Sequence, residues 1–265
     1  AKENRSELQK VLEYYKNDSL KLEAAKYLIS NMTGSYAIDS SMQKAYSAFY
    51  QIYYNVCEKY NNEINKKCGE EIDSLWQVFC FVNSEELIGK KMDDARFLKA
   101  STLISEIELA FKVWKENIYT RTCSFNEFCE YILPYRRENE LIIDDSRELF
   151  YDRHHNDFYT RDGKNFIEET DSLLFLYKDM KHSPYYVPKI PLLNVSAFEK
   201  VKTGTCEQRC WFNSILLSSL GMATAIDFVP AWGNRNGGHS WNVIIVKGVS
   251  YAFEAFWDND RWKYK

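Results

Sequence analysis

The sequence has no surplus of basic charge and no long apolar run. Its 34 lysines and arginines stand against 38 aspartates and glutamates, so the net charge is −4. Nucleic acids and anionic membrane surfaces are bound through clusters of basic side chains, and the charge balance argues against both as partners. No apolar run approaches the ~20 residues of a membrane span, and no signal-peptide hydrophobic segment is present. We therefore expect no transmembrane segment in this chain.

Paired cysteine motifs are also absent. The seven cysteines form no CxxC pair and no regular framework: Cys57, Cys68, Cys80, Cys123, Cys129, Cys206 and Cys210. A chain of this size does not need disulfides for stability, so most of these residues are expected to be buried free thiols. No set of cysteines and histidines has the spacing of metal ligands, and no calcium-binding loop is evident. We expect neither a metal nor another cofactor.

The first half of the chain has the apolar spacing of helices. Apolar residues recur at helical intervals in three stretches: 3–31, 40–60 and 93–114. Ser124 followed by Glu127 matches the capping-box pattern, and Pro134 ends the helix that this box begins. Residues 1–133 are therefore expected to form a mostly helical region.

Residues 134–200 are more polar and are expected to form a connector and groove edge. Pro184, Pro188 and Pro191 indicate an extended approach to the last part of the chain, because a helix cannot run through them. His154 and His155 stand next to each other in a polar stretch, and adjacent side chains diverge. We interpret this stretch as a surface loop rather than a metal or base site.

The segment from Gly204 onwards predicts a buried helix that begins at a cysteine. Thr205 and Gln208 match a capping box, and Gly221 after Leu220 supplies the stop. Cys206 then lies in the first turn, where unpaired backbone N–H groups and the helix dipole favour a thiolate. The same N–H groups are suited to stabilise an oxyanion on a reacting carbonyl.

Three strands are expected after this helix, at 223–232, 241–246 and 249–256, with a tight turn at 247–248. If residue 246 pairs with 249, residue 239 lies opposite 256. Glu254 is then a diagonal neighbour of His239 on the same face, with backbones roughly 7–8 Å apart. Asp258 is the other diagonal neighbour, so pairing alone does not choose the carboxylate that contacts the histidine.

Four short motifs in this order resemble the transglutaminase-like superfamily of cysteine enzymes. They are Gly204-Thr205-Cys206, Leu220-Gly221-Met222-Ala223, Gly238-His239-Ser240-Trp241 and Phe253-Glu254. The resemblance implies an α+β fold, with an N-terminal mostly helical region followed by a papain-like core at 201–265, in which a central helix packs on antiparallel strands. It covers some 60 residues, and the helical region matches bacterial members only loosely.

The resemblance also implies a Cys-His-Glu triad and a reaction. Cys206 would be the nucleophile, His239 the general base and then acid, and Glu254 the residue that orients the imidazole, with Asp258 as the alternative acid. The expected activity is acyl transfer on peptide or protein amides. Hydrolysis is preferred over crosslinking, because Glu207 stands where crosslinking transglutaminases usually carry tryptophan. The competing hypothesis is a non-catalytic module that keeps the fold and binds a peptide or glycan.

Further expectations concern the substrate and the cellular context. Trp232 and Trp241 are candidate walls for the substrate acyl chain; core packing is the alternative for both and is preferred for Trp241. The absence of an initial methionine and the habit of the family predict export in a bacterium, as a periplasmic, lipid-anchored or secreted protein. The chain ends eleven residues after Glu254, which leaves room for a further domain after Lys265.

Overall fold

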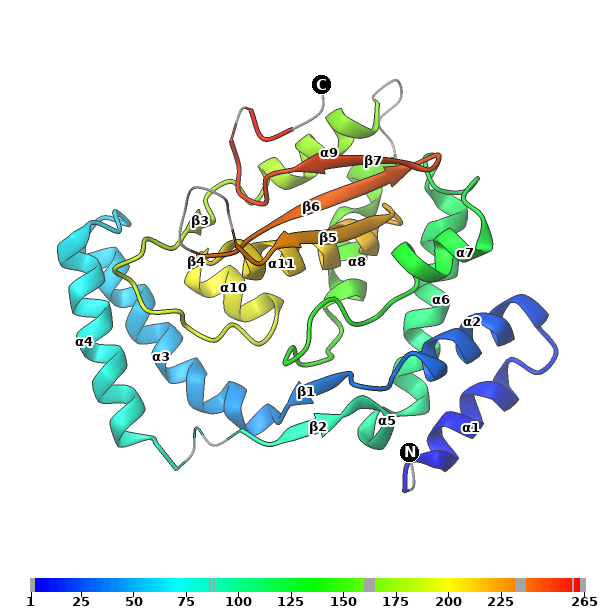
Figure 1. Ribbon diagram of the computed structural model, residues 1–265, viewed down its shortest axis with the longest axis horizontal. Coiled ribbons are helices and arrows are strands. Elements are labelled where there is room, and N and C mark those ends of the chain that lie inside the picture. Colours follow the sequence, from blue (N-terminus) through cyan, green and yellow to red (C-terminus); the bar gives the residue numbers. More distant parts are fainter. Residues whose placement is uncertain are drawn as a thin grey trace.

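The protein is a mixed α+β structure in which helices predominate and the strands form small sheets (Figure 1). The computed structural model describes residues 3–85, 87, 89–159, 165–231, 237–258 and 260–262. The helices in these ranges are α1 (Arg5–Tyr14), α2 (Ser19–Ser30), α3 (Ser40–Lys59), α4 (Lys66–Val82), α5 (Asp94–Phe97), α6 (Ala100–Glu116), α7 (Phe125–Glu127), the π-helix η1 (Phe128–Ile132), α8 (Ser146–Tyr159), α9 (Phe166–Phe175), α10 (Val195–Val201) and α11 (Cys206–Ser219). The strands are β1 (Tyr36–Ile38), β2 (Lys91–Asp93), β3 (Lys181–His182), β4 (Thr203–Gly204), β5 (Thr224–Val229), β6 (His239–Val246) and β7 (Val249–Phe253).

Helix α11 packs on the antiparallel sheet β5-β6-β7 on one side and on α8 and α6 on the other. It begins at the predicted capping box, in which the Thr205 side chain accepts a hydrogen bond from the Gln208 N–H and the Gln208 side chain accepts one from the Thr205 N–H. Its apolar side chains, including Trp211 and Phe212, are almost fully buried. Burying both sides of the helix removes a large apolar area from water, which stabilises its position in the core.

Gly221 ends α11 and brings the helix close to α6. It has φ +75°, a conformation that glycine adopts without steric cost. A Cβ at this position would lie 2.5 Å from the backbone oxygen of Val113 in α6. Asn117 donates a hydrogen bond to the Leu220 carbonyl at 2.8 Å, and Thr120 donates one to the Gly221 carbonyl at 2.6 Å. The end of the central helix is therefore fixed by the helical region.

The register of the three-stranded sheet confirms the predicted hairpin. Val246 pairs with Val249, and Asn242 pairs with Phe253 in the same register. Strand β5 pairs with β6 along its whole length, so Val229 lies opposite His239. The outer strands are shorter than predicted, because β5 ends at Val229 and β7 ends at Phe253.

The N-terminal helices form two groups, as Figure 1 shows. Helices α1 and α2 pack on α6, and α3 packs on α4 and on α10. The predicted capping box of Ser124 and Glu127 is present at the start of α7. One cluster of packed apolar side chains continues from Leu8 to Trp262, so the helical region and the terminal unit share a core.

Residues 134–200, expected as a connector and groove edge, contain the three helices α8, α9 and α10. The interpretation of the stretch around His154 and His155 as a surface loop is wrong. His154 lies in α8 with only 7% of its surface exposed, and its Nε2 is 2.8 Å from the Tyr177 hydroxyl. Helix α8 buries polar side chains, among them Arg147 and His154, so its buried face does not form the apolar stripe by which a helix is recognised in a sequence.

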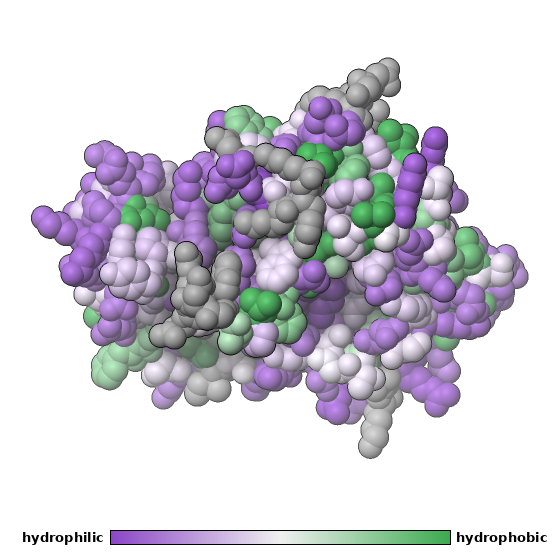
Figure 2. All heavy atoms as spheres, turned by 45° about the horizontal axis from the view of Figure 1, so that its top comes forward, coloured by the Kyte–Doolittle hydropathy of each residue, from purple (hydrophilic) through white to green (hydrophobic). Residues whose placement is uncertain are grey.

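Hydrophilic and hydrophobic residues are interspersed over the face shown in Figure 2. Among the described residues, no helix is both long enough and apolar enough to cross a membrane.

Candidate active site

Cys206 is the first residue of α11 and is partly exposed. The strand β4 just before it pairs in parallel with β3, so Gly204 lies beside His182. Gly204 leaves no room for a side chain, because a Cβ there would meet the Gln208 side chain at 2.9 Å and the Phe198 ring at 3.0 Å. The backbone is therefore held tightly up to Cys206. The unpaired N–H groups of the first helical turn favour negative charge at this end of the helix.

The other six cysteines have thiols whose pKa is raised by burial. All seven are free thiols. Burial raises the pKa of Cys57 to about 12 and that of Cys129 to about 11. Burial also raises the pKa of each remaining thiol: Cys68, Cys80, Cys123 and Cys210. A raised pKa leaves little thiolate at neutral pH, so these six side chains are poor nucleophiles.

His239 and Glu254 form the polar centre of the site. His239 begins β6, and its Nε2 is 2.8 Å from Oε2 of Glu254, which directly follows β7. Both side chains are largely but not fully buried, with 18% and 26% of their surface exposed. An ionised carboxylate only accepts hydrogen bonds, so Nε2 carries the proton in this pair. In neutral His239 the lone pair is then on Nδ1, the nitrogen suited to take a proton from a nucleophile.

Asp258, the alternative acid, makes a different contact. Its Oδ1 accepts a hydrogen bond from the Asp260 N–H at 3.2 Å, and its side chain is exposed. Of the two carboxylates that the pairing arithmetic allowed, Glu254 is the one bound to His239.

Glu254 is positioned by the last described residues of the chain. Its backbone N–H donates to the Arg261 carbonyl at 2.9 Å. The Arg261 guanidinium is buried and forms an ion pair with Asp171 of α9, which also accepts a hydrogen bond from the Trp262 indole at 2.9 Å. The segment after β7 is thus anchored to α9, and this anchoring fixes the backbone that carries the carboxylate.

Two groups of hydrogen bonds connect the His239–Glu254 pair to α11. Asn242, three residues after His239, donates from Nδ2 to the Cys210 carbonyl at 3.0 Å. The Ala255 carbonyl, next to Glu254, accepts from Nδ2 of Asn213 at 2.9 Å. Asn213 also donates to Oδ1 of Asn242 at 2.9 Å. Because Cys210 lies one turn after Cys206, the pair is held at the end of the helix where the thiol lies.

The direction of packing agrees with this placement. The C-terminal half of β6 lies at the C-terminal end of α11, because the Ile245 N–H donates to the carbonyl of Ala223, just beyond the helix. The N-terminal end of β6, with His239, therefore lies toward the N-terminal end of the helix. Burial is the main cause that raises the pKa of Cys210, and the nearby Glu254 carboxylate raises it further. Glu254 is therefore within electrostatic range of the first turns of α11.

Four residues near the site were not recognised from the sequence: Asn213 and Asn242, described above, and Arg209 and His182. Arg209, in the first turn of α11, is buried and donates from Nε to the Ala255 carbonyl at 3.3 Å; burial lowers its pKa to about 9. His182 lies beside Gly204, and its ring meets the Phe256 ring edge-on at 5.3 Å. Asn242 stands beside the apolar run of β6, a signal that indicates a buried polar contact. Helix α11 is mixed in polarity, so Arg209 and Asn213 gave no such signal.

The two predicted substrate walls have different outcomes. Trp241 is partly buried, packs against the core, and has its ring 5.9 Å from that of His239. Trp232 lies outside the described residues. Among the residues that the structure describes, His, Cys, Asp and Glu side chains do not gather in a group of three or more that could hold a metal ion.

Comparison with known proteins adds no relative to this description. No family model, no curated protein and no solved structure matches the chain.

Proposed function

We propose that the protein is a cysteine-dependent acyl-transfer enzyme that hydrolyses peptide or protein amides, with Cys206, His239 and Glu254 as its triad. The observation that carries the proposal is the 2.8 Å bond between Nε2 of His239 and Oε2 of Glu254, held against the helix that Cys206 begins. A thiol at a helix start, an imidazole and a carboxylate that orients it are the parts of a thiol nucleophile site. The proposed fold of residues 201–265 is the papain-like core of the transglutaminase-like superfamily.

In the proposed first half-reaction, Nδ1 of His239 takes the proton of the Cys206 thiol, and the sulfur attacks the carbonyl carbon of the amide. The negative charge moves to the carbonyl oxygen, where first-turn N–H groups of α11 are suited to stabilise it. The C–N bond then breaks, and the imidazolium returns its proton to the leaving amine. The products of this half are a thioester on Cys206 and a free amine.

In the second half-reaction, water attacks the thioester while His239 takes one of its protons. The C–S bond breaks, the acid leaves, and the proton passes back to the sulfur. An amine in place of water would give transamidation. The negative charge of Glu254 stabilises the imidazolium that forms in both halves, as the carboxylate does in other triads.

The test is a digestion of denatured casein in water enriched in ¹⁸O, with cadaverine added in a parallel reaction. Hydrolysis places ¹⁸O in new carboxyl groups, whereas transamidation adds the mass of the diamine, and both are read by mass spectrometry. We expect ¹⁸O incorporation that is lost in Cys206→Ser and kept in Cys80→Ser, a control in α4. Equal activity of Cys206→Ser and wild type would contradict the triad. No product in any reaction would favour the non-catalytic binding module.

A further inference from the structure

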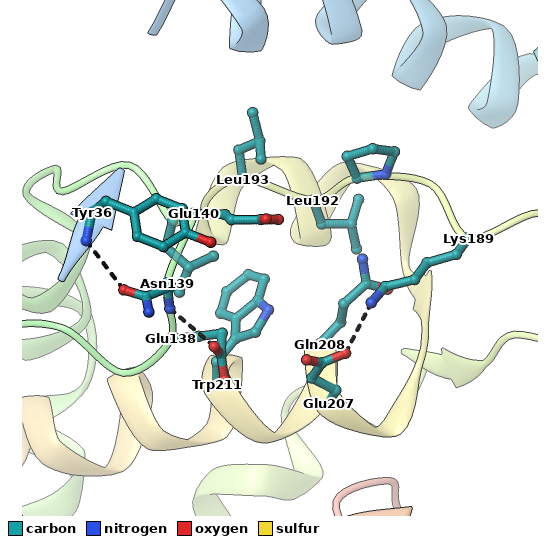
Figure 3. Close-up of a pocket in the computed structure, with 12 residues that line it drawn as sticks. Tyr36, Glu138, Asn139, Glu140, Lys189, Leu192, Leu193, Glu207, Gln208 and Trp211 are labelled. Atoms are coloured by element: carbon teal, nitrogen blue, oxygen red, sulfur yellow. Dashed lines mark hydrogen bonds and ion pairs between the residues drawn. The ribbon is translucent and has the colours of Figure 1, made fainter. Parts of the chain in front are cut away.

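A cavity of about 320 Å³ lies against the first two turns of α11. Glu207, Gln208 and Trp211 line it from the helix, and the segments 138–141 and 189–193 form other walls (Figure 3). With about 100° between successive helical residues, these three side chains leave α11 on a different face from Arg209 and Asn213, which contact Ala255. The cavity therefore lies at the same end of α11 as Cys206, but not on the face of the helix that packs on the sheet.

The cavity has an excess of negative charge. Three carboxylates line it, those of Glu138, Glu140 and Glu207, against the single ammonium of Lys189. Lys189 is paired with Glu207, with 2.9 Å between Nζ and Oε2. In the described part of the chain, Glu138 and Glu140 have no salt bridge to a cation. Burial raises the pKa of Glu138, and the charges of Glu207 and Glu140 raise it further, as expected where like charges gather.

An unused hydrogen-bond donor faces the same space. Trp211 is only 2% exposed, and within the described residues its indole N–H has no acceptor. Figure 3 shows the nitrogen edge of the ring turned toward the space between Leu192 and Gln208, while the Glu140 carboxylate and the Tyr36 hydroxyl extend into the region above the ring. The indole N–H therefore opens onto the cavity, where a ligand oxygen can accept a hydrogen bond from it.

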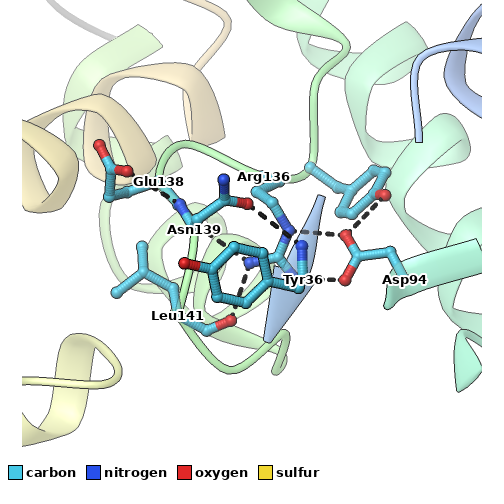
Figure 4. Close-up of polar contacts among 7 residues, drawn as sticks. Tyr36, Asp94, Arg136, Glu138, Asn139 and Leu141 are labelled. Atoms are coloured by element: carbon cyan, nitrogen blue, oxygen red, sulfur yellow. Dashed lines mark hydrogen bonds and ion pairs between the residues drawn. The ribbon is translucent and has the colours of Figure 1, made fainter. Parts of the chain in front are cut away.

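The wall that carries Glu138 and Glu140 is held in place by a buried ion pair (Figure 4). Arg136 contacts both oxygens of Asp94 at 2.6 Å, and Asp94 is fully buried. The Arg136 guanidinium also donates to the carbonyls of Glu138 and Leu141. The carboxylates are thus presented by a rigid backbone, which lowers the entropic cost of binding a ligand between them.

We propose that this cavity binds a lysine residue of a peptide, with its ammonium group between the carboxylates of Glu138 and Glu140 and a peptide carbonyl oxygen on the Trp211 N–H. A lysine side chain supplies a cation for the two carboxylates that Lys189 does not pair with, and its methylene stem packs along Leu192 and the indole face. An ammonium near an aromatic face gains a further favourable interaction. Binding itself is independent of catalysis. The role of the cavity as a specificity pocket for lysine next to the attacked amide rests on the proposed function.

The experiment is calorimetric titration of the wild-type protein with Nα-acetyl-L-lysinamide and, as a matched control ligand, Nα-acetyl-L-norleucinamide. The norleucine compound has a side chain of similar shape without the ammonium. We expect the lysine compound to bind at least ~10-fold more tightly, the difference that one charge-assisted hydrogen bond provides. Glu138→Gln and Glu140→Gln should each reduce this difference ~3-fold or more. Glu63→Gln, which removes an exposed carboxylate elsewhere on the chain, should leave it unchanged.

Equal affinity for the two compounds, or saturable binding of neither, overturns the proposal. The same holds if Glu63→Gln weakens lysine binding as much as the two pocket variants do, because the effect would then be one of net charge. Circular dichroism checks that each variant folds, and two independent variants guard against one that does not. Lysine binding by a protein whose Cys206 is unreactive would refute the proposed function alone, and a reactive Cys206 without lysine binding would refute the pocket alone.

Discussion

The contact between His239 and Glu254 predicts how strongly one carboxylate controls the reactivity of Cys206. In Glu254→Gln the side chain keeps its size and loses its charge, so the imidazolium that forms when the thiol gives up its proton is no longer stabilised. A hydrogen bond to a charged group contributes ~1.5–3 kcal/mol. Because both side chains are partly exposed, at 18% and 26%, we take the lower part of this range, about 1.5–2 kcal/mol. Since 1.4 kcal/mol is a factor of ten, the alkylation rate of Cys206 should fall ~10–30-fold.

The assay is the rate of iodoacetamide modification of the Cys206 peptide at pH 7, followed by quantitative mass spectrometry. Asp258→Asn is the matched control, because it removes a neighbouring carboxylate that contacts the Asp260 N–H and not the histidine. We expect this control to stay within ~2-fold of wild type, since exposed charges contribute little at a distance. A larger effect from Asp258→Asn than from Glu254→Gln would refute the assignment of the acid.

Three predictions concern stability. Gly221→Ala should destabilise the fold by ~3 kcal/mol or more in urea unfolding, because the new Cβ would lie 2.5 Å from the Val113 carbonyl oxygen at a positive φ; an unchanged midpoint would refute this. Asp94→Asn should cost ~3–5 kcal/mol in the same assay, since it leaves the Arg136 guanidinium buried without its counter-charge; a loss below ~1 kcal/mol would contradict the buried pair. Burial lowers the pKa of His154 to about 4 from an ordinary 6.5. As pH falls from 6.5 toward 4, the unfolded chain binds a proton at this residue that the folded chain does not, so the free energy of unfolding decreases by up to ~3 kcal/mol. His154→Gln should flatten that part of the stability profile.

Local features could be predicted from the sequence because they depend on nearby residues. The capping box at Thr205, the stop at Gly221 and the hairpin turn after Val246 each follow from a few adjacent letters, and all three are present. The hairpin register then placed Glu254 near His239 by counting alone. Counting allows both Glu254 and Asp258 as the partner of His239, because it cannot show where the strand ends and the side chains change direction.

Features that need distant segments could not be predicted. The cavity proposed to bind lysine combines residues from β1, the loop after η1, the segment before α10 and the start of α11, and no local pattern joins them. The anchoring of Glu254 through Arg261 to Asp171 of α9 is equally non-local. His154 was misinterpreted for the same reason, because its partner Tyr177 lies in a separate segment. Export, substrate identity and the Trp232 wall stay predictions.

The central claim is that Cys206 is a nucleophile activated by His239, and competitive alkylation of the native protein tests it most directly. Limiting iodoacetamide at pH 7, followed by peptide mapping, ranks the seven thiols by rate. We predict that Cys206 reacts at least ~10-fold faster than any other cysteine, because burial raises the pKa of the other six. We also predict that His239→Ala removes this advantage. Slow labelling of Cys206 at the rate of the other thiols, or fast labelling that His239→Ala leaves unchanged, would contradict the account.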